Sequence, residues 1–128
     1  MVWLNALMGG LFVLSAGLQL NDPDPAGWVI AYLLGGAACA AWHQAWLTRW
    51  RAWALSLAYG AGALWVWWGV PDGAEVASAL SHWKMVGVGA EPIREAVGLG
   101  VVALWMDVLG WCHPNHAGNS GLETSRHT

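Results

Sequence analysis

The polar side chains best suited to chemistry lie in two short stretches of the chain. The first is "QLNDPDPAGW", residues 19–28, which sets two acid-proline pairs between two apolar segments. The second is "EPIRE", in which Arg94 lies between Glu91 and Glu95. Carboxylates beside a guanidinium can form a forked ion pair, and carboxylates without such a partner can bind a cation or a polar head group. The two stretches therefore offer either a structural clamp or a ligand site.

Two groups of residues are candidates for a functional site. The candidate polar cluster consists of Gln19, Asn21, Asp22, Asp24, Arg94 and Glu95. The secondary candidates are Trp28, His82, Glu91 and Asp107. All of these residues except Asp107 are expected on the same side of a membrane.

Arg94 has the strongest need for an acidic partner. It falls in the first turn of a predicted helix that starts at Pro92, where a cation opposes the helix dipole near a low-dielectric boundary. Its candidate partners are Asp22, Asp24 and Glu95. Asp24 also has a structural role available, because it precedes a proline and can cap the helix that follows, with a gain of about 0.3–1 kcal/mol. We therefore expect a clamp that ties the first connection to the last helix.

Asp107 is a separate case, because it lies about one turn from the opposite end of the last predicted helix. An acid in the middle of a membrane helix costs roughly 2.5–3.5 kcal/mol on insertion scales, which makes it a functional candidate. A position so close to the interface also lets it reach water or pair with Arg49 or Arg51. We favour this structural interpretation.

The elements that carry these residues follow from the composition. The chain has 128 residues, of which 57% are hydrophobic and 10% charged, and it contains 12 tryptophans but only one phenylalanine. A bilayer core of about 30 Å requires roughly 20 apolar residues per helix, and runs of nearly that length recur along the chain. The net charge of −3, with only five Lys and Arg residues, excludes a nucleic-acid-binding surface.

The apolar runs predict an all-α fold, a small integral membrane bundle of four transmembrane helices. The predicted spans cover about residues 3–20, 25–46, 51–70 and 92–111. The first run lacks the basic start and the small-residue cleavage site of a secretion signal, so we expect it to be retained as a helix. Proline is absent from the interior of all four runs.

Two segments differ from the predicted spans. Between the third and fourth spans, Val76, Leu80 and Trp83 recur at helical spacing, which predicts a short amphipathic helix over about residues 73–86 that lies along the membrane surface. Residues 113–128 are polar and have little to bury, so we expect a disordered tail. Residues 1–112 then form a single transmembrane domain.

The short connection between the second and third spans indicates the orientation, because it carries Arg49 and Arg51. The positive-inside tendency places this connection in the cytoplasm, and four spans then place both termini there too. We expect a multi-pass protein of a bacterial-type inner membrane or a plasma membrane. The tryptophans agree with such spans, because they gather near the two ends of the predicted helices as aromatic belts do.

The sequence offers little support for catalysis or metal binding. Cys39 and Cys112 have no partner at metal-ligand spacing, and Pro114 breaks the helix that would hold His113 and His116 on one face. The serines have no nucleophile setting, and phosphate-binding loops are absent. A heme or pigment site at His43 would lack an opposed ligand. We predict no cofactor and no metal.

Two passages resemble a known family. "QLNDPDPAGWVIAY" after a first membrane helix, together with "REAVGLGVVALWM" near the C-terminus, is similar to the transmembrane protein 220 family. The positions that match its pattern are Gln19, Asn21, Asp22, Pro23, Asp24, Pro25, Trp28, Tyr32, Arg94, Glu95, Gly98 and Leu99. The resemblance implies a compact helical membrane protein, and it implies no catalytic role that can be carried over.

Two functional hypotheses remain. The first is an interaction or accessory subunit whose partners are membrane lipids and other membrane protein subunits, because the concentrated polarity suits the fixing of helices. The alternative is a small transporter or membrane enzyme that binds a cation or a polar head group at the acids of the candidate polar cluster.

Overall fold

The described part of the chain is entirely helical. The computed structural model describes residues 1–21, 24–70 and 90–113, and within these ranges no strand is present. The long helices are α1 (Val2–Leu18), α2 (Pro25–His43), α3 (Arg49–Trp68) and α5 (Ala90–Trp111), and α1 is followed by a short 3-10 turn, η1 (Gln19–Asn21). The predicted all-α class is therefore confirmed. The predicted interfacial helix lies outside the described residues, as does the predicted tail beyond residue 113.

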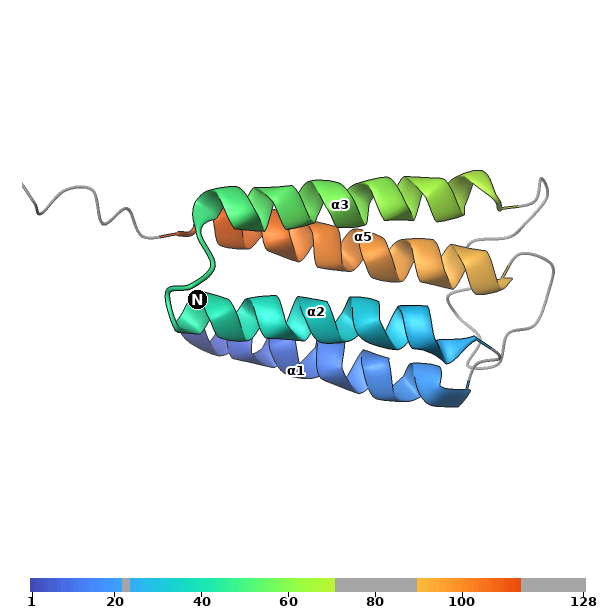
Figure 1. Cartoon of the computed structure of the whole chain (residues 1–128), viewed down its shortest axis with the longest axis horizontal. Helices are drawn as coiled ribbons and strands as arrows, with labels where there is room; N and C mark the ends of the chain where they lie inside the picture. Colours follow the sequence, from blue (N-terminus) through green and yellow to red (C-terminus); the bar gives the residue numbers. More distant parts are fainter. Residues whose placement is uncertain (22–23, 71–89, 114–128) are drawn as a thin grey trace, which may run out of the picture.

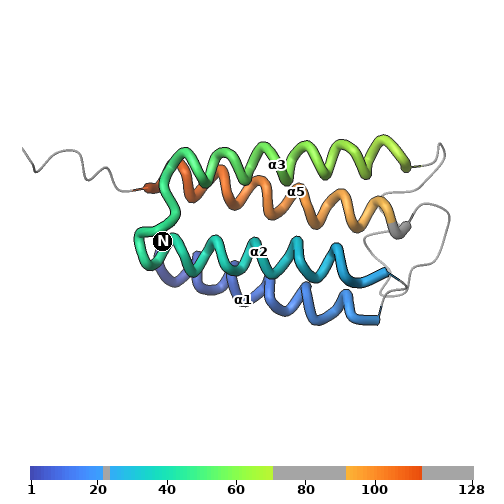
Figure 2. Tube along the Cα trace, in the orientation of Figure 1, coloured from blue at the N-terminus to red at the C-terminus, as the bar shows by residue number. Residues whose placement is uncertain are grey.

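The four helices form two antiparallel hairpins that lie side by side (Figure 1). In the first hairpin α1 packs on α2, and in the second α3 packs on α5. The contact between α2 and α5 is much smaller than the contact within either hairpin. The tube trace shows that Met1 and the end of α5 lie at the same end of the bundle (Figure 2).

Small residues allow the helices of the first hairpin to approach closely. A Cβ atom added to Gly9 would lie 3.1 Å from the Cβ of Cys39, and one added to Gly36 would lie 3.1 Å from a methyl group of Val13. Gly35 faces both Phe12 and Val102, so that its missing side chain makes room for the core between the hairpins. Such small-residue contacts are typical of helix pairs in membranes.

The ends of two helices differ from the prediction. The helix α2 ends at His43 rather than near residue 46, because Ala45 takes a positive φ of 61° and the backbone N–H groups of Trp46 and Leu47 both bond to the carbonyl of Ala41. The following helix, α3, starts at Arg49, where the Thr48 side chain caps it by accepting a hydrogen bond of 3.3 Å from the Arg51 N–H. These turns make a tight connection between the hairpins.

The outer surface of the bundle is rich in large apolar side chains. Leu57 is 76% exposed and Trp65 is 83% exposed, and each of the four helices presents further exposed leucines or tryptophans. Two helical segments, Val2–Asn21 and Pro25–His43, are long and apolar enough to cross a membrane. A contiguous apolar exterior of this kind marks a surface that contacts a membrane or a protein partner.

Candidate functional site

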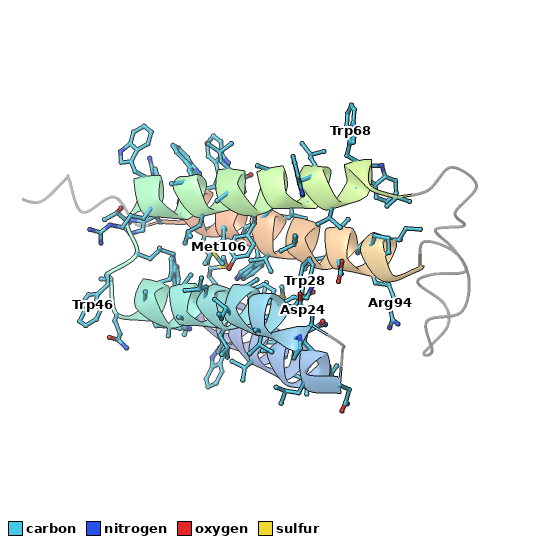
Figure 3. The ribbon with its side chains drawn as sticks, turned by 45° about the vertical axis from the view of Figure 1, so that its right-hand side comes forward. Asp24, Trp28, Trp46, Trp68, Arg94 and Met106 are labelled. Atoms are coloured by element: carbon cyan, nitrogen blue, oxygen red, sulfur yellow. The ribbon has the colours of Figure 1, made fainter. Side chains whose placement is uncertain are left out.

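The described residues of the candidate polar cluster lie at one end of the bundle, where α1 ends and α2 and α5 begin (Figure 3). We call this the polar end. Asn21 and Asp24 are exposed there, whereas Gln19, Arg94 and Glu95 are half-buried. Asp22 and His82 lie outside the described residues, and so does the side chain of Glu91. The predicted grouping at one end is thus found for these five residues.

Asp24 occupies the N-cap position of α2, and Pro25 is the first residue of that helix. The predicted position is therefore right, but the Asp24 carboxylate accepts no capping hydrogen bond. Within the described ranges it also forms no ion pair, although Arg94 points from α5 at the same end (Figure 3). Asp24 is exposed, so water satisfies its charge, and it is removed from the candidate partners of Arg94.

Arg94 does not lie in the first turn of its helix, as the sequence had suggested. Because α5 begins at Ala90, two residues before Pro92, Arg94 is the fifth residue of the helix. The effect of the helix dipole falls off within the first turn, so Arg94 opposes it less than expected. Proline at the third helical position is tolerated, because the N–H groups of the first turn have no intrahelical partner.

Glu95 lies near Tyr32 and Gly98, two other positions at which the sequence resembles the family pattern. Its carboxylate lies within electrostatic reach of the Tyr32 phenol, which is buried between α2 and α5. The hydroxyl of Tyr32 packs directly on Gly98, one turn further along α5, so that a Cβ atom at this position would overlap it. The structure therefore brings Tyr32, Glu95 and Gly98 together, although they are far apart in the sequence.

A buried polar hub at Asn5 was missed by the sequence analysis. Asn5 in α1 is 0% exposed, and its Nδ2 atom donates a hydrogen bond of 2.9 Å to the carbonyl of Cys39 in α2. The indole N–H of Trp105 in α5 donates to the Asn5 Oδ1 atom over 3.0 Å. One amide therefore joins three helices. A single asparagine within an apolar run is the signal that points to such an interhelical bond.

A second interhelical bond joins the two hairpins. The Tyr59 hydroxyl in α3 donates a hydrogen bond of 2.5 Å to the carbonyl of Ala31 in α2. Tyr59 is buried, so its hydroxyl needs this partner. The bond fixes the position of α3 relative to α2, a helix with which it otherwise has little contact.

The opposite end of the bundle contains an arginine and several tryptophans. The Arg49 guanidinium lies 5.8 Å from the ring centre of Trp53 and donates a long hydrogen bond of 3.5 Å to the carbonyl of His113. Trp53 packs against the Trp111 ring in a tilted arrangement, with a centroid distance of 5.5 Å. Arg51 donates to the Trp46 carbonyl over 3.0 Å. This end joins the start of α3 to the end of α5.

Asp107 is half-buried on α5 toward this end. Among the described residues Asp107 forms no ion pair, so of the two structural roles that the sequence left open, water contact or pairing with Arg49 or Arg51, the pairing is not found. Arg49 instead donates to the His113 carbonyl and lies over the Trp53 ring, and Arg51 donates to the Trp46 carbonyl. Partial exposure leaves Asp107 in reach of water. In the same described ranges, no three side chains of the His, Cys, Asp and Glu types converge on a point where a metal ion fits.

The all-α bundle, with its apolar exterior, its membrane-length helices and its buried polar hub, defines a small helical membrane protein. The chain belongs to transmembrane family 220, because the family model described as "Transmembrane family 220, helix" matches residues 11–111. The resemblance inferred from the sequence is therefore confirmed. Neither the curated proteins nor the solved structures gave a match to the chain.

Proposed function

We propose that the protein is a four-span membrane subunit that acts by interaction with other membrane proteins. The observation that supports this role most directly is the use of its buried polar groups. Asn5 and Tyr59 donate hydrogen bonds to backbone carbonyls of neighbouring helices, and Trp105 donates to Asn5. These groups are engaged in holding helices together, which suits a compact scaffold.

All four helices have the length that the four-span arrangement requires. A bilayer core of about 30 Å needs roughly 17–25 helical residues, and α1, α2, α3 and α5 have 17, 19, 20 and 22 residues. Figure 3 places Trp46 and Trp68 toward opposite ends of the bundle, as expected of two aromatic belts. Arg49 and Arg51 favour a cytoplasmic location for the end that carries both described termini.

The test of the accessory role is isolation of the full chain from its native membrane in a mild detergent. We expect it to migrate in a complex of fixed stoichiometry with a second membrane protein, and we expect the level of that protein to fall when this chain is deleted. Re-expression of the intact chain restores the level. A chain that is isolated alone, and whose deletion leaves the membrane proteome unchanged, contradicts the proposal.

We further propose that Arg94 forms a clamp at the polar end. Arg94 and Glu95 each interact with another residue, and Asp24 does not pair with Arg94. Consecutive residues of a helix do not face each other, which disfavours Glu95 as the partner. Of the predicted acids, Asp22 is therefore the best candidate, and its ion pair with Arg94 would tie the first connection to α5.

The substitution Arg94→Gln is expected to lower the free energy of unfolding by about 1 kcal/mol, the upper value for an ion pair that is partly screened by solvent. Thermal unfolding in detergent, followed by circular dichroism, measures the change. Asp22→Asn should give the same loss, and the double variant should lose no more than either single one. Asp24→Asn is the matched control and should be neutral. Equal losses at Asp22 and Asp24, or none at Arg94, would rule out this clamp.

A further inference from the structure

A groove of about 320 Å³ runs between the two hairpins. Its walls contain small residues, Gly27 and Ala31 on α2 and Ala58 and Gly62 on α3, and Leu99 of α5 also lines it. The small side chains leave space where α2 and α3 pass each other with little direct packing. The groove is therefore a consequence of how the two hairpins meet.

The lining of the groove is apolar. Among the described residues that line it, the one polar side chain is Tyr59, whose hydroxyl already donates to the carbonyl of Ala31. A polar ligand would find no donor that is still available in this lining, and burial of its polar groups without partners costs several kcal/mol in hydrocarbon surroundings. The groove is consequently suited to an apolar occupant.

The rim of the groove identifies the class of occupant. Ile30 is 58% exposed and Leu34 is 55% exposed, so the groove is continuous with the apolar outer surface of α2. In the four-span arrangement proposed above, that surface contacts the acyl chains of the bilayer.

We propose that the groove holds one acyl chain of a membrane phospholipid, which fills the space between α2 and α3 as part of the bundle. The volume lies at the lower limit of about 300 Å³ for small-molecule sites, which suits a single chain. This inference rests on the proposed four-span arrangement. Recognition is by the chain, so the head group should have little influence.

Native mass spectrometry of the full-length protein, delipidated and then supplied with phosphatidylcholine or, separately, with phosphatidylglycerol of the same acyl chains, tests the site. The wild type is expected to retain one phospholipid per chain, and Ala58→Leu, which fills the groove, should reduce retention at least fivefold. Ala61→Leu adds the same atoms to the exposed surface of the same helix, outside the groove, and should retain lipid as the wild type does. Equal retention by the two variants, or retention that depends on the head group, would overturn the proposal.

A second measurement on the wild type does not depend on the folding of variants. A phosphatidylcholine with a diazirine in its acyl chain, bound at one lipid per protein, should crosslink to α2 and α3 at the groove residues. Crosslinks distributed evenly over all the helices, including α1, which does not line the groove, would count against the site.

A topology measurement separates failure of this site from failure of the four-span arrangement. Cys112 is exposed, and a membrane-impermeant maleimide should label it from one side, whereas Gly69→Cys in a Cys112→Ser background should be labelled from the other side. Labelling of both from the same side would contradict the four spans themselves. Labelling from opposite sides without lipid retention would overturn the groove proposal alone.

Discussion

Gly98→Val is expected to lower the free energy of unfolding by about 2–3 kcal/mol, at the upper end of the usual cost of overpacking. The buried Tyr32 hydroxyl lies where the new Cβ atom would be placed, and the ring carbon that carries this hydroxyl would be 3.1 Å away. Tyr32 is only 8% exposed, so little free space is available into which its ring could move. Thermal unfolding in detergent, monitored by circular dichroism, measures the loss.

The same helix provides the matched control for this substitution. A Cβ atom added to Gly100 would meet no other atom of the described residues within 4 Å. Gly100→Val should therefore be neutral or stabilising, because glycine is less favourable in a helix than other residues by up to about 1 kcal/mol. Tyr32→Phe removes the hydroxyl oxygen, the atom nearest to a Cβ at position 98, and should restore part of the stability that Gly98→Val loses. If the Gly98 and Gly100 variants melt alike, the close packing of Tyr32 on α5 is wrong.

Asn5→Leu is expected to cost about 1–3 kcal/mol of stability. Leucine has a similar size, but it removes both hydrogen bonds of the hub and leaves the indole N–H of Trp105 buried without an acceptor. Interhelical hydrogen bonds in membrane proteins contribute about 0.6 kcal/mol on average, with a maximum near 1.7, so two such bonds account for the range. The readout is again the melting transition in detergent.

A double-mutant cycle distinguishes the hub from a simple change of volume. Trp105→Phe removes the buried donor, so the additional loss caused by Asn5→Leu should be smaller in the Trp105→Phe background than in the wild type. Ser15→Ala serves as the control, because the Ser15 hydroxyl bonds only to the Leu11 carbonyl of its own helix. Strict additivity of the Asn5 and Trp105 substitutions would show that the two side chains do not act together.

The sequence predicted the helices well, because long apolar runs between polar breaks are a strong signal. It predicted their ends less well. The C-terminus of α2 depends on Ala45 in a left-handed conformation, and alanine gives no indication of such a turn, whereas glycine would. At the start of α5, Pro92 was taken as the first helical residue, but the helix begins at Ala90, since proline fits throughout the first turn.

The candidate site was predictable in location but not in detail. Hydropathy and the number of helices place Gln19, Asp24 and Arg94 at one end, because consecutive helices alternate in direction. Contacts between helices depend instead on the rotation of each helix about its own axis and on its register along its neighbour. A helix that is apolar on all sides gives no indication of either. Only the three-dimensional structure therefore shows that Tyr32 packs on Gly98 and that the Trp105 N–H donates a hydrogen bond to Asn5.

The hub at Asn5 also bears on the order in which the chain is made. Asn5 and Trp105 are 100 residues apart, whereas the Cys39 carbonyl follows Asn5 after 34 residues. During synthesis the amide of Asn5 can therefore find its acceptor on α2 early, but its own acceptor oxygen is used only when α5 has emerged. The helix α3 likewise precedes its main packing partner, α5. Asn5, in the second turn of α1, therefore has all of its hydrogen bonds only after the last helix has been made. Completion of α5 is thus the step that closes the bundle.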